Sequence, residues 1–267
     1  MSESFYVTLP SNDTSFEDNT ISSFKTKLNY KIHLDDDYEV GISNITFTKS
    51  WYNLRKDLKI ALIPRLNSNN NTPPLYMTAV PKGYYTDIYH IFDKITARLV
   101  QLSNNVVNRE HIIFKYDNLT RKVIFKWQIT AFPTSTVKFD NGLSQILGFQ
   151  NYTEYSTAAD GFFTRVGNQS IDLTGGVHSL FIYSDIVEPS HVGRMMTPLL
   201  RTVGVNTFAT FGDNHIIDYD SPQYRRVLPR EFETIEINIR DGVGDPIEFQ
   251  FGQVIVTLHF RKWMNTT

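Results

Sequence analysis

Apolar and polar residues alternate most regularly near the end of the chain. In ETIEINIRD (residues 233–241) isoleucine recurs at every second position, and QVIVTLHFRKW (residues 253–263) continues the alternation. A period of two places one kind of side chain on each face of a β-strand. The joining segment DGVGDPIEF (residues 241–249) contains two glycines and a proline, which favour a turn. We therefore predict two β-strands joined by a turn, each with one buried face.

Shorter apolar runs earlier in the chain have the same character, and aromatic residues, which pack well in sheets, make up 13% of the sequence. From Ile88 to Leu102, however, apolar residues recur with helical spacing, which predicts an amphipathic helix over residues 87–102. Many short strands and a helix in a connection predict an all-β fold, either a β-sandwich or a jelly roll. The further strands are predicted over residues 20–28, 38–47, 58–63, 111–116, 122–129 and 180–187.

Composition excludes several classes of function. The chain has 267 residues, a formal net charge of −2 and no cysteine. This charge offers no broad basic field for wrapping a polyanion, and without cysteine there are no disulfides, thiolate metal sites or cysteine nucleophiles. The N-terminal segment lacks the features of a signal peptide, and no stretch approaches the ~20 apolar residues of a membrane span. We therefore expect a protein made in the cytoplasm, without a membrane span.

The best candidates for chemistry follow the apolar run 180–187. Asp185 and Glu188 lie close in sequence to His178 and His191. Paired carboxylates at the end of a strand could perform acid–base catalysis if one had a raised pKa, or could hold a metal ion together with a histidine. A hydrolase is therefore one hypothesis for this chain.

The alternative interpretation is structural: the two carboxylates cap backbone amides or pair with Arg194 or Arg201. No phosphate loop, dinucleotide fingerprint, nucleophile elbow or His-Glu-x-x-His motif is present. Because nothing else completes a mechanism, we favour the structural interpretation, and we expect no catalytic residue, no metal and no cofactor. A second polar segment, YRRVLPR (residues 224–230), mixes aromatic and cationic residues between acidic stretches, which indicates a solvated loop or one side of a protein contact.

Three long segments resemble one protein family. The first comprises FYVTLPSNDTSFEDNTISSFKTKL and YEVGISNITFTKSWYNL, the second is LFIYSDIVEPSHVGRMMTPLLRTV, and the third is REFETIEINIRDGVGDPIEFQFGQVIVTLHFRK. In this order they resemble the penton (minor capsid) proteins of Maverick/Polinton elements, adintoviruses and related virophages. The resemblance runs from about residue 5 to residue 262 and leaves a divergent middle, residues 66–139.

The resemblance implies one jelly-roll domain over residues 1–267, built from two packed four-stranded antiparallel sheets. Residues 1–19 would be a flexible N-terminal arm, and residues 66–139 a connection that packs on the jelly roll. The implied function is structural and non-enzymatic: a homopentamer at the vertex of an icosahedral virion, among copies of a double-jelly-roll major capsid protein, without sequence-specific binding of nucleic acid. The alternative is a lectin-like host binding module derived from an integrated element.

The resemblance also implies roles for particular residues. The loop after residues 180–187 would be a structural signature, formed by Asp185, Glu188, Pro189 and Arg201. The N-terminal arm would contact its partner through Phe5, Tyr6 and Leu9. We expect Trp51 and Tyr52 either in the subunit contact or closing the bottom of the sandwich. The full set of candidate contact residues is Trp51, Tyr52, Tyr224, Arg225, Arg226, Arg230, Glu231 and Trp263.

Overall fold

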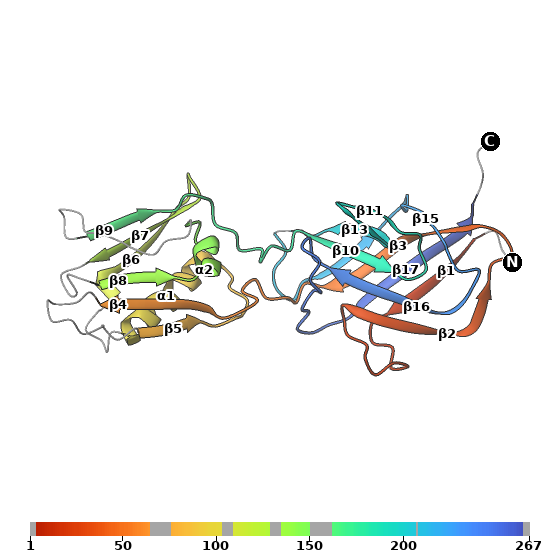
Figure 1. The fold of residues 1–267 in the computed structure, drawn as a ribbon, viewed down its shortest axis with the longest axis horizontal. Helices are drawn as coiled ribbons and strands as arrows, with labels where there is room; N and C mark the ends of the chain where they lie inside the picture. The colour runs from red at the N-terminus through yellow and green to blue at the C-terminus, as the bar shows by residue number, and fades with distance from the viewer. Residues whose placement is uncertain are drawn as a thin grey trace. The chain divides into compact units, whose positions relative to one another are not determined.

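A computed structural model of the chain describes residues 4–64, 76–102, 109–128, 135–149, 162–206 and 208–263. The chain divides into two compact units (Figure 1). The first, which we call the sandwich unit, comprises residues 1–51 and 176–267, and the second, the inserted unit, comprises residues 52–175. The expectation of a single domain is therefore wrong, because residues 52–175 enclose a hydrophobic core of their own.

Two antiparallel sheets form the sandwich unit. In the first sheet the strand order is β1-β17-β3-β14, and the short strand β15 also pairs with β3. In the second sheet the order is β13-β10-β16-β2, and a separate hairpin, β11-β12, lies between β10 and β13 in the chain. The bounds are β1 Ser4–Pro10, β2 Ser23–His33, β3 Tyr38–Thr48, β10 Ser179–Ser184, β11 Ser190–Val192, β12 Met195–Thr197, β13 Leu199–Gly204, β14 Asn214–Asp218, β15 Arg225–Arg226, β16 Glu231–Arg240 and β17 Val254–Lys262.

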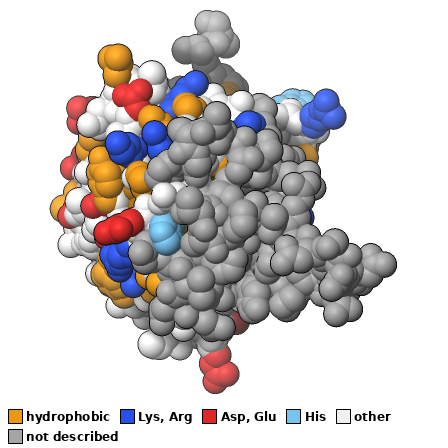
Figure 2. Space-filling model, turned by 90° about the vertical axis from the view of Figure 1, so that its left-hand side faces the viewer, with side chains coloured by type: hydrophobic (Ala, Val, Ile, Leu, Met, Phe, Trp, Pro, Cys, Tyr) orange, Lys and Arg blue, Asp and Glu red, His pale blue; other side chains and the backbone are white. Residues whose placement is uncertain are grey.

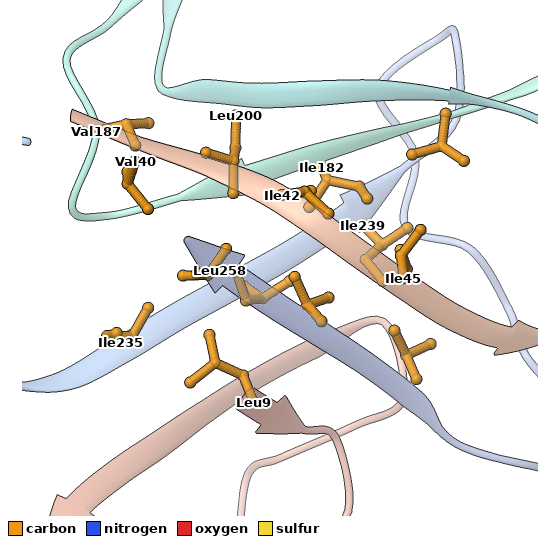
Figure 3. Packing of buried hydrophobic residues seen from close by; sticks show 14 of the residues in the cluster. Leu9, Val40, Ile42, Ile45, Ile182, Val187, Leu200, Ile235, Ile239 and Leu258 are labelled. Carbon is orange, nitrogen blue, oxygen red and sulfur yellow. The ribbon is translucent and has the colours of Figure 1, made fainter. Parts of the chain in front are cut away.

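The core of the sandwich unit consists of the apolar faces that the alternation predicts. Ile235 and Ile239 on β16 are fully buried, as is Leu258 on β17. Figure 3 shows these side chains meeting Val40 and Ile42 of β3 between the sheets. Burying a side chain of this size contributes about 1.5–3 kcal/mol of transfer free energy. Hydrophobic burial on one face of each strand therefore holds the two sheets together.

The N-terminal segment belongs to this sandwich and is not a flexible arm. Strand β1 pairs with β17 along its whole length, from Ser4 opposite Arg261 to Pro10 opposite Ile255. Leu9 is fully buried in the core. The alternation that places Phe5 and Leu9 on one face gives β1 an apolar side to bury, so the segment completes the chain's own sheet.

The loop after β1 is also held in place. The side-chain amide of Asn19 donates to the carbonyl oxygens of Asp13 and Lys25, at 2.9 Å each. Its Oδ1 atom accepts from the backbone N–H of Lys25 at 2.8 Å. One asparagine therefore ties the loop to the start of β2, and the described part of the expected arm is ordered.

The inserted unit contains two three-stranded antiparallel sheets, β5-β4-β8 and β6-β7-β9, with helices α1 and α2 and a short 3-10 helix. The predicted helix 87–102 is present as α1, and it begins where the Asp87 carboxylate accepts from the backbone N–H of His90 at 2.9 Å. The apolar face of α1 packs in this unit's own core and not on the sandwich unit. The bounds are β4 Leu58–Pro64, β5 Tyr76–Val80, α1 Ile88–Leu102, η1 Arg109–His111, β6 Ile112–Asp117, β7 Lys122–Gln128, β8 Ser135–Phe139, α2 Asn141–Ile146 and β9 Phe162–Val166.

Aromatic side chains dominate the core of the inserted unit. Phe92 of α1 stacks on Phe114 of β6, with ring centres 4.9 Å apart, and Phe114 stacks in turn on Phe125 of β7 at 4.7 Å. Phe139 of β8 contacts Phe125 with ring centres 5.6 Å apart. These rings join the helix and both sheets. None of the described helices combines the length and the apolar character needed to cross a lipid bilayer.

Candidate functional site: a charged rim of the sandwich unit

Charged and aromatic side chains gather where four segments of the sandwich unit meet. The segments are the β2–β3 turn, the stretch from β15 to the start of β16, the loop after β10, and the end of β17. The first three of these segments line a shallow hollow of about 240 Å³. We call the following residues the rim: Asp36, Asp37, Glu39, Glu188, Tyr224, Arg226, Arg230, Arg261, Lys262 and Trp263.

Asp37 is the centre of the rim. Its two carboxylate oxygens accept from different arginines, Oδ2 from Arg226 at 2.8 Å and Oδ1 from Arg230 at 2.7 Å. Its backbone carbonyl accepts from the N–H of Trp263 at 2.8 Å, and the guanidinium carbon of Arg226 lies 5.6 Å from the centre of the Trp263 ring. A single aspartate in the β2–β3 turn thus orients two arginines and the chain end that holds the tryptophan.

A second group lies along β17. Arg261 donates through Nε to Glu39, and its guanidinium carbon lies 3.6 Å from the centre of the Tyr224 ring. The Tyr224 hydroxyl is 2.8 Å from Nδ1 of His259. Burial, with a further effect from the charge of Arg261, lowers the pKa of His259 below its usual value. This histidine is therefore held neutral and packed, and it is not a free proton donor at neutral pH.

One acidic residue of the rim, Asp36, is held in its charged form by the cation beside it. Lys262 lies 2.7 Å from Asp36, and its hydrogen bond and charge lower the pKa of that carboxyl. Exposed ion pairs of this kind contribute little to folding, because water and salt screen their charges. Their main effect is to fix the positions of side chains that face outwards.

Local sequence explains how Tyr224 reaches this position. Strand β15 pairs with β3, with Arg225 opposite Val40 and Arg226 opposite Glu39. The chain just before β15 crosses β3 at Gly41, where an added Cβ would lie 2.9 Å from the Gln223 carbonyl oxygen. Any larger residue at this point would push the crossing segment, and the tyrosine after it, away from the sheet.

The loop after β10 is joined to the same stretch. Val187 forms a β-bridge with Val227, the backbone N–H of Glu188 donates to the carbonyl of Arg226 at 2.9 Å, and the N–H of Leu228 donates to the carbonyl of Ile186 at 2.9 Å. Two polar segments that are distant in sequence, DIVEP and YRRVLPR, therefore form one structural feature.

Asp185 and Glu188 do not form a paired carboxylate site. The Asp185 carboxylate accepts from the backbone N–H of Glu236 at 2.9 Å, whereas Glu188 lines the hollow of the rim. Loss of hydration raises the pKa of Asp185, and the hydrogen bond from Glu236 opposes this effect. Asp185 thus caps a backbone amide, as the structural interpretation predicts.

The other members of the hydrolase hypothesis are not assembled around these carboxylates. His178 and His191 are exposed, and within the described ranges no group of three or more histidine and acidic side chains could hold a metal ion. Neither Arg194 nor Arg201 forms an ion pair in the described part of the chain. The guanidinium carbon of Arg201 instead lies 3.3 Å from the centre of the Tyr219 ring.

Several predicted contact residues lie elsewhere. Trp51 is only 3% exposed and packs edge-on against Phe249, so it closes the sandwich and offers no contact area. Tyr52 belongs to the inserted unit. Glu231 pairs with Lys31 and His33 on the neighbouring strand β2, and these charges lower its pKa. These positions are not part of the rim.

Of the remaining candidates, Tyr224, Arg226, Arg230 and Trp263 belong to the rim, and Arg225 is half-buried on β15 beside it. Pro189 is exposed directly before β11. In the N-terminal strand Phe5 packs on Phe260, whereas Tyr6 is 65% exposed and stacks on His259.

Sequence reasoning missed the acidic half of the rim. The run LDDDYE supplies Asp36, Asp37 and Glu39, and the ending HFRKW supplies Arg261 and Lys262. Opposite charge between LDDDYE and the two basic runs, YRRVLPR and HFRKW, was the available signal. It was weak, because sequence alone does not say which runs meet.

Comparison with known proteins supports the fold. No family model matches the chain, and no curated protein matches it. Among solved structures, the mavirus penton protein matches 98% of this chain and 99% of its own, with a TM-score of 0.52 and 14% sequence identity. The D1-D2-D3 domains of the flagellar cap protein FliD from Escherichia coli match with 9% identity, coverage of 98% and 56%, and a TM-score of only 0.21. The first similarity confirms the predicted all-β, jelly-roll fold, and it is to a protein of the class that the three sequence segments resemble.

Proposed function

We propose that this chain is a penton protein: five copies form a closed ring at each vertex of an icosahedral capsid built from a double-jelly-roll major capsid protein. The observation that supports this most strongly is the similarity in fold to the mavirus penton protein over nearly the full length of both chains, inserted unit included. The three ordered sequence segments support the same function independently. Its place would be the virion, after synthesis in the cytoplasm of the host cell.

The rim is our candidate for one side of the contact between subunits. A ring of identical copies needs two different surfaces on each copy, because each contact is head-to-tail. Contact centres are enriched in tryptophan, tyrosine and arginine. The rim presents Trp263, 43% exposed, near Arg226, which Asp37 already orients together with Arg230. Leu228, 55% exposed, lines the hollow of the rim. Side chains held before contact lose less freedom on binding.

The proposed function is structural, without catalysis. The Asp185 carboxylate accepts from the backbone N–H of Glu236, and Glu188 is held through its backbone N–H. The carboxylates of Asp36, Asp37 and Glu39 are paired with basic side chains of the rim. Groups that are committed to neighbours in this way fix shape and are poorly placed to transfer protons to a substrate.

Co-expression with a double-jelly-roll major capsid protein tests the proposal. We expect particles that contain this chain at their vertices, and a reduced share of it in particles made with Trp263→Ala or Arg226→Ala. Lys27→Ala is the matched control, because Lys27 is exposed on β2 outside the rim and its loss should change nothing. Particles that close without this chain would contradict the vertex function. Equal incorporation of all variants would contradict the rim as the contact.

A further inference from the structure

The two units have opposite charge. The inserted unit contains 14 lysines and arginines against 9 aspartates and glutamates, a formal charge of +5, whereas the sandwich unit contains 12 against 19, a charge of −7. The overall charge of −2 is therefore the sum of a basic inserted unit and an acidic sandwich unit. Such segregation indicates an anionic partner for the basic part.

Part of this positive charge lies on one face of the sheet β6-β7-β9. In the strand register Lys115 is opposite Ile124, and Ile113 is opposite Lys126. Residues between them, such as Phe125, point into the core. Because side chains alternate along a strand, the other face presents lysines and aliphatic residues together. We call it the lysine face, and its residues are Ile113, Lys115, Lys122, Ile124, Lys126 and Val166.

The lysines of this face outnumber its described acidic residues and form no ion pair with them. None of the three has an ion-pair or hydrogen-bond partner for its ammonium group within the described segments. Asp117, opposite Lys122, is the acidic residue in this register, and its carboxylate accepts from Thr120 at 2.6 Å and from the N–H of Leu119 at 3.0 Å. The face therefore has cations available for an external anion.

In the view of Figure 2, the described side chains that are visible include hydrophobic, basic and acidic types. On the lysine face, Lys122 and Lys126 lie four residues apart on β7, roughly 13 Å along the strand. Lys115 of β6 lies opposite Ile124, which is between them on β7, so aliphatic side chains separate the cations.

This chemistry favours one kind of polyanion. Single-stranded nucleic acid is usually bound with aromatic side chains that stack on bases, but the described aromatic residues of β6 and β7, such as Phe114 and Trp127, face the core. A membrane surface calls for several exposed apolar side chains that insert, but Ile113 and Ile124 are half-buried, and of the apolar residues of the lysine face only Val166 is 50% exposed. A sugar ring with anionic substituents offers both an apolar C–H face and spaced negative charges, which match the aliphatic and cationic positions.

We propose that the lysine face of the inserted unit binds an anionic polysaccharide, that is, a chain of sulfated or carboxylated sugars. The contacts would be ammonium groups on sulfate or carboxylate, with the sugar rings lying against Ile113, Ile124 and Val166. This inference does not depend on the vertex function, since it rests on the inserted unit alone.

The test measures binding of the full chain to heparin as a function of salt concentration. We expect binding at low salt that weakens steadily as salt rises, because paired charges are screened. The variant Lys115→Gln/Lys122→Gln/Lys126→Gln should bind at least about tenfold more weakly, since it removes three such pairs. The matched control is Lys56→Gln/Lys82→Gln/Lys94→Gln, which removes the same charge from exposed positions of the same unit and should retain most of the affinity.

Two further probes decide the class of ligand. Oligo(dT) and vesicles of phosphatidylcholine with phosphatidylserine should bind more weakly than heparin, and equal or tighter binding of either would overturn the choice of a polysaccharide. No binding to heparin, or an equal loss in both triple variants, would overturn the lysine face. Thermal unfolding of each variant verifies that it is folded. The incorporation of each variant into particles is measured in parallel, so that a loss of heparin binding can be distinguished from a loss of capsid assembly.

Discussion

The rings of Phe5 and Phe260 stack almost parallel, with centres 4.8 Å apart and planes 3° from each other. One residue belongs to the first strand of the chain and the other to the last, and the two lie directly opposite in the ladder between β1 and β17. The contact shows that the beginning of the chain is part of the sandwich before any assembly. The stability of the sandwich unit should therefore depend on its N-terminal strand.

We predict that the N-terminal strand is needed for stability. Leu9→Ala should lower the free energy of unfolding by about 2–5 kcal/mol, the range for removing a large aliphatic side chain from a core. Tyr6→Ala is the control, since Tyr6 points outwards and should cost much less. Urea unfolding measures both. Wild-type stability of Leu9→Ala would show that the segment is an arm after all.

Substitution by alanine should have very different effects on stability at Trp51 and at Trp263. Trp51→Ala removes a buried ring and should destabilise the unit by about 3–5 kcal/mol. Trp263→Ala should change stability by no more than about 0.5 kcal/mol, because the side chain is largely at the surface. Denaturant titrations followed by circular dichroism would show the difference. A large loss of stability in Trp263→Ala would mean that the rim supports the fold and is not a free contact surface.

Asp185 allows the structural and catalytic interpretations to be separated. Asp185→Ala should cost about 1 kcal/mol, because the amide of Glu236 loses its acceptor. Asp185→Asn keeps an acceptor oxygen and removes a charge that is poorly hydrated, so its stability should equal or exceed that of the wild type. Equal destabilisation by both variants, measured by thermal unfolding, would contradict this role.

Stability should fall as pH decreases from about 7 to 5. The folded state lowers the pKa of His259 and of His215, in both cases mainly through burial, so the unfolded chain binds protons more readily over this range. Protonation therefore favours unfolding, and the loss begins as pH falls through the unfolded pKa of about 6.5. His259→Gln should flatten the dependence, whereas His191→Gln, at an exposed position, should leave it unchanged. An unchanged slope in His259→Gln would contradict this assignment.

The alternating strands and the amphipathic helix could be predicted because local burial determines them. Residues 233–241 and 253–263 alternate regardless of which partner strand they meet, and they form β16 and β17 almost as expected. The helix predicted over residues 87–102 is observed as Ile88–Leu102 for the same reason. A strand or helix with one buried face has apolar residues at regular intervals in its sequence, whichever fold surrounds it.

The division into two units could not be predicted in this way. Leu58–Pro64 and Tyr38–Thr48 are both strands rich in apolar residues, but one enters the core of the inserted unit and the other the core of the sandwich unit. The periodicity of apolar residues shows that one face of an element is buried. It does not show which other element covers that face. The rim could not be predicted for a related reason, because the ion pair Asp37–Arg230 joins segments that are far apart in the chain.

The most direct test of the central claim is the mass of the purified chain in solution, measured by light scattering over a wide range of concentration. The vertex function predicts a closed species near five times 30.9 kDa as concentration rises. Trp263→Ala should shift that transition to higher concentration, with Lys27→Ala as the control. A mass that levels off at a dimer or trimer, or a monomer at every concentration, would contradict a five-membered ring held by contacts of this chain.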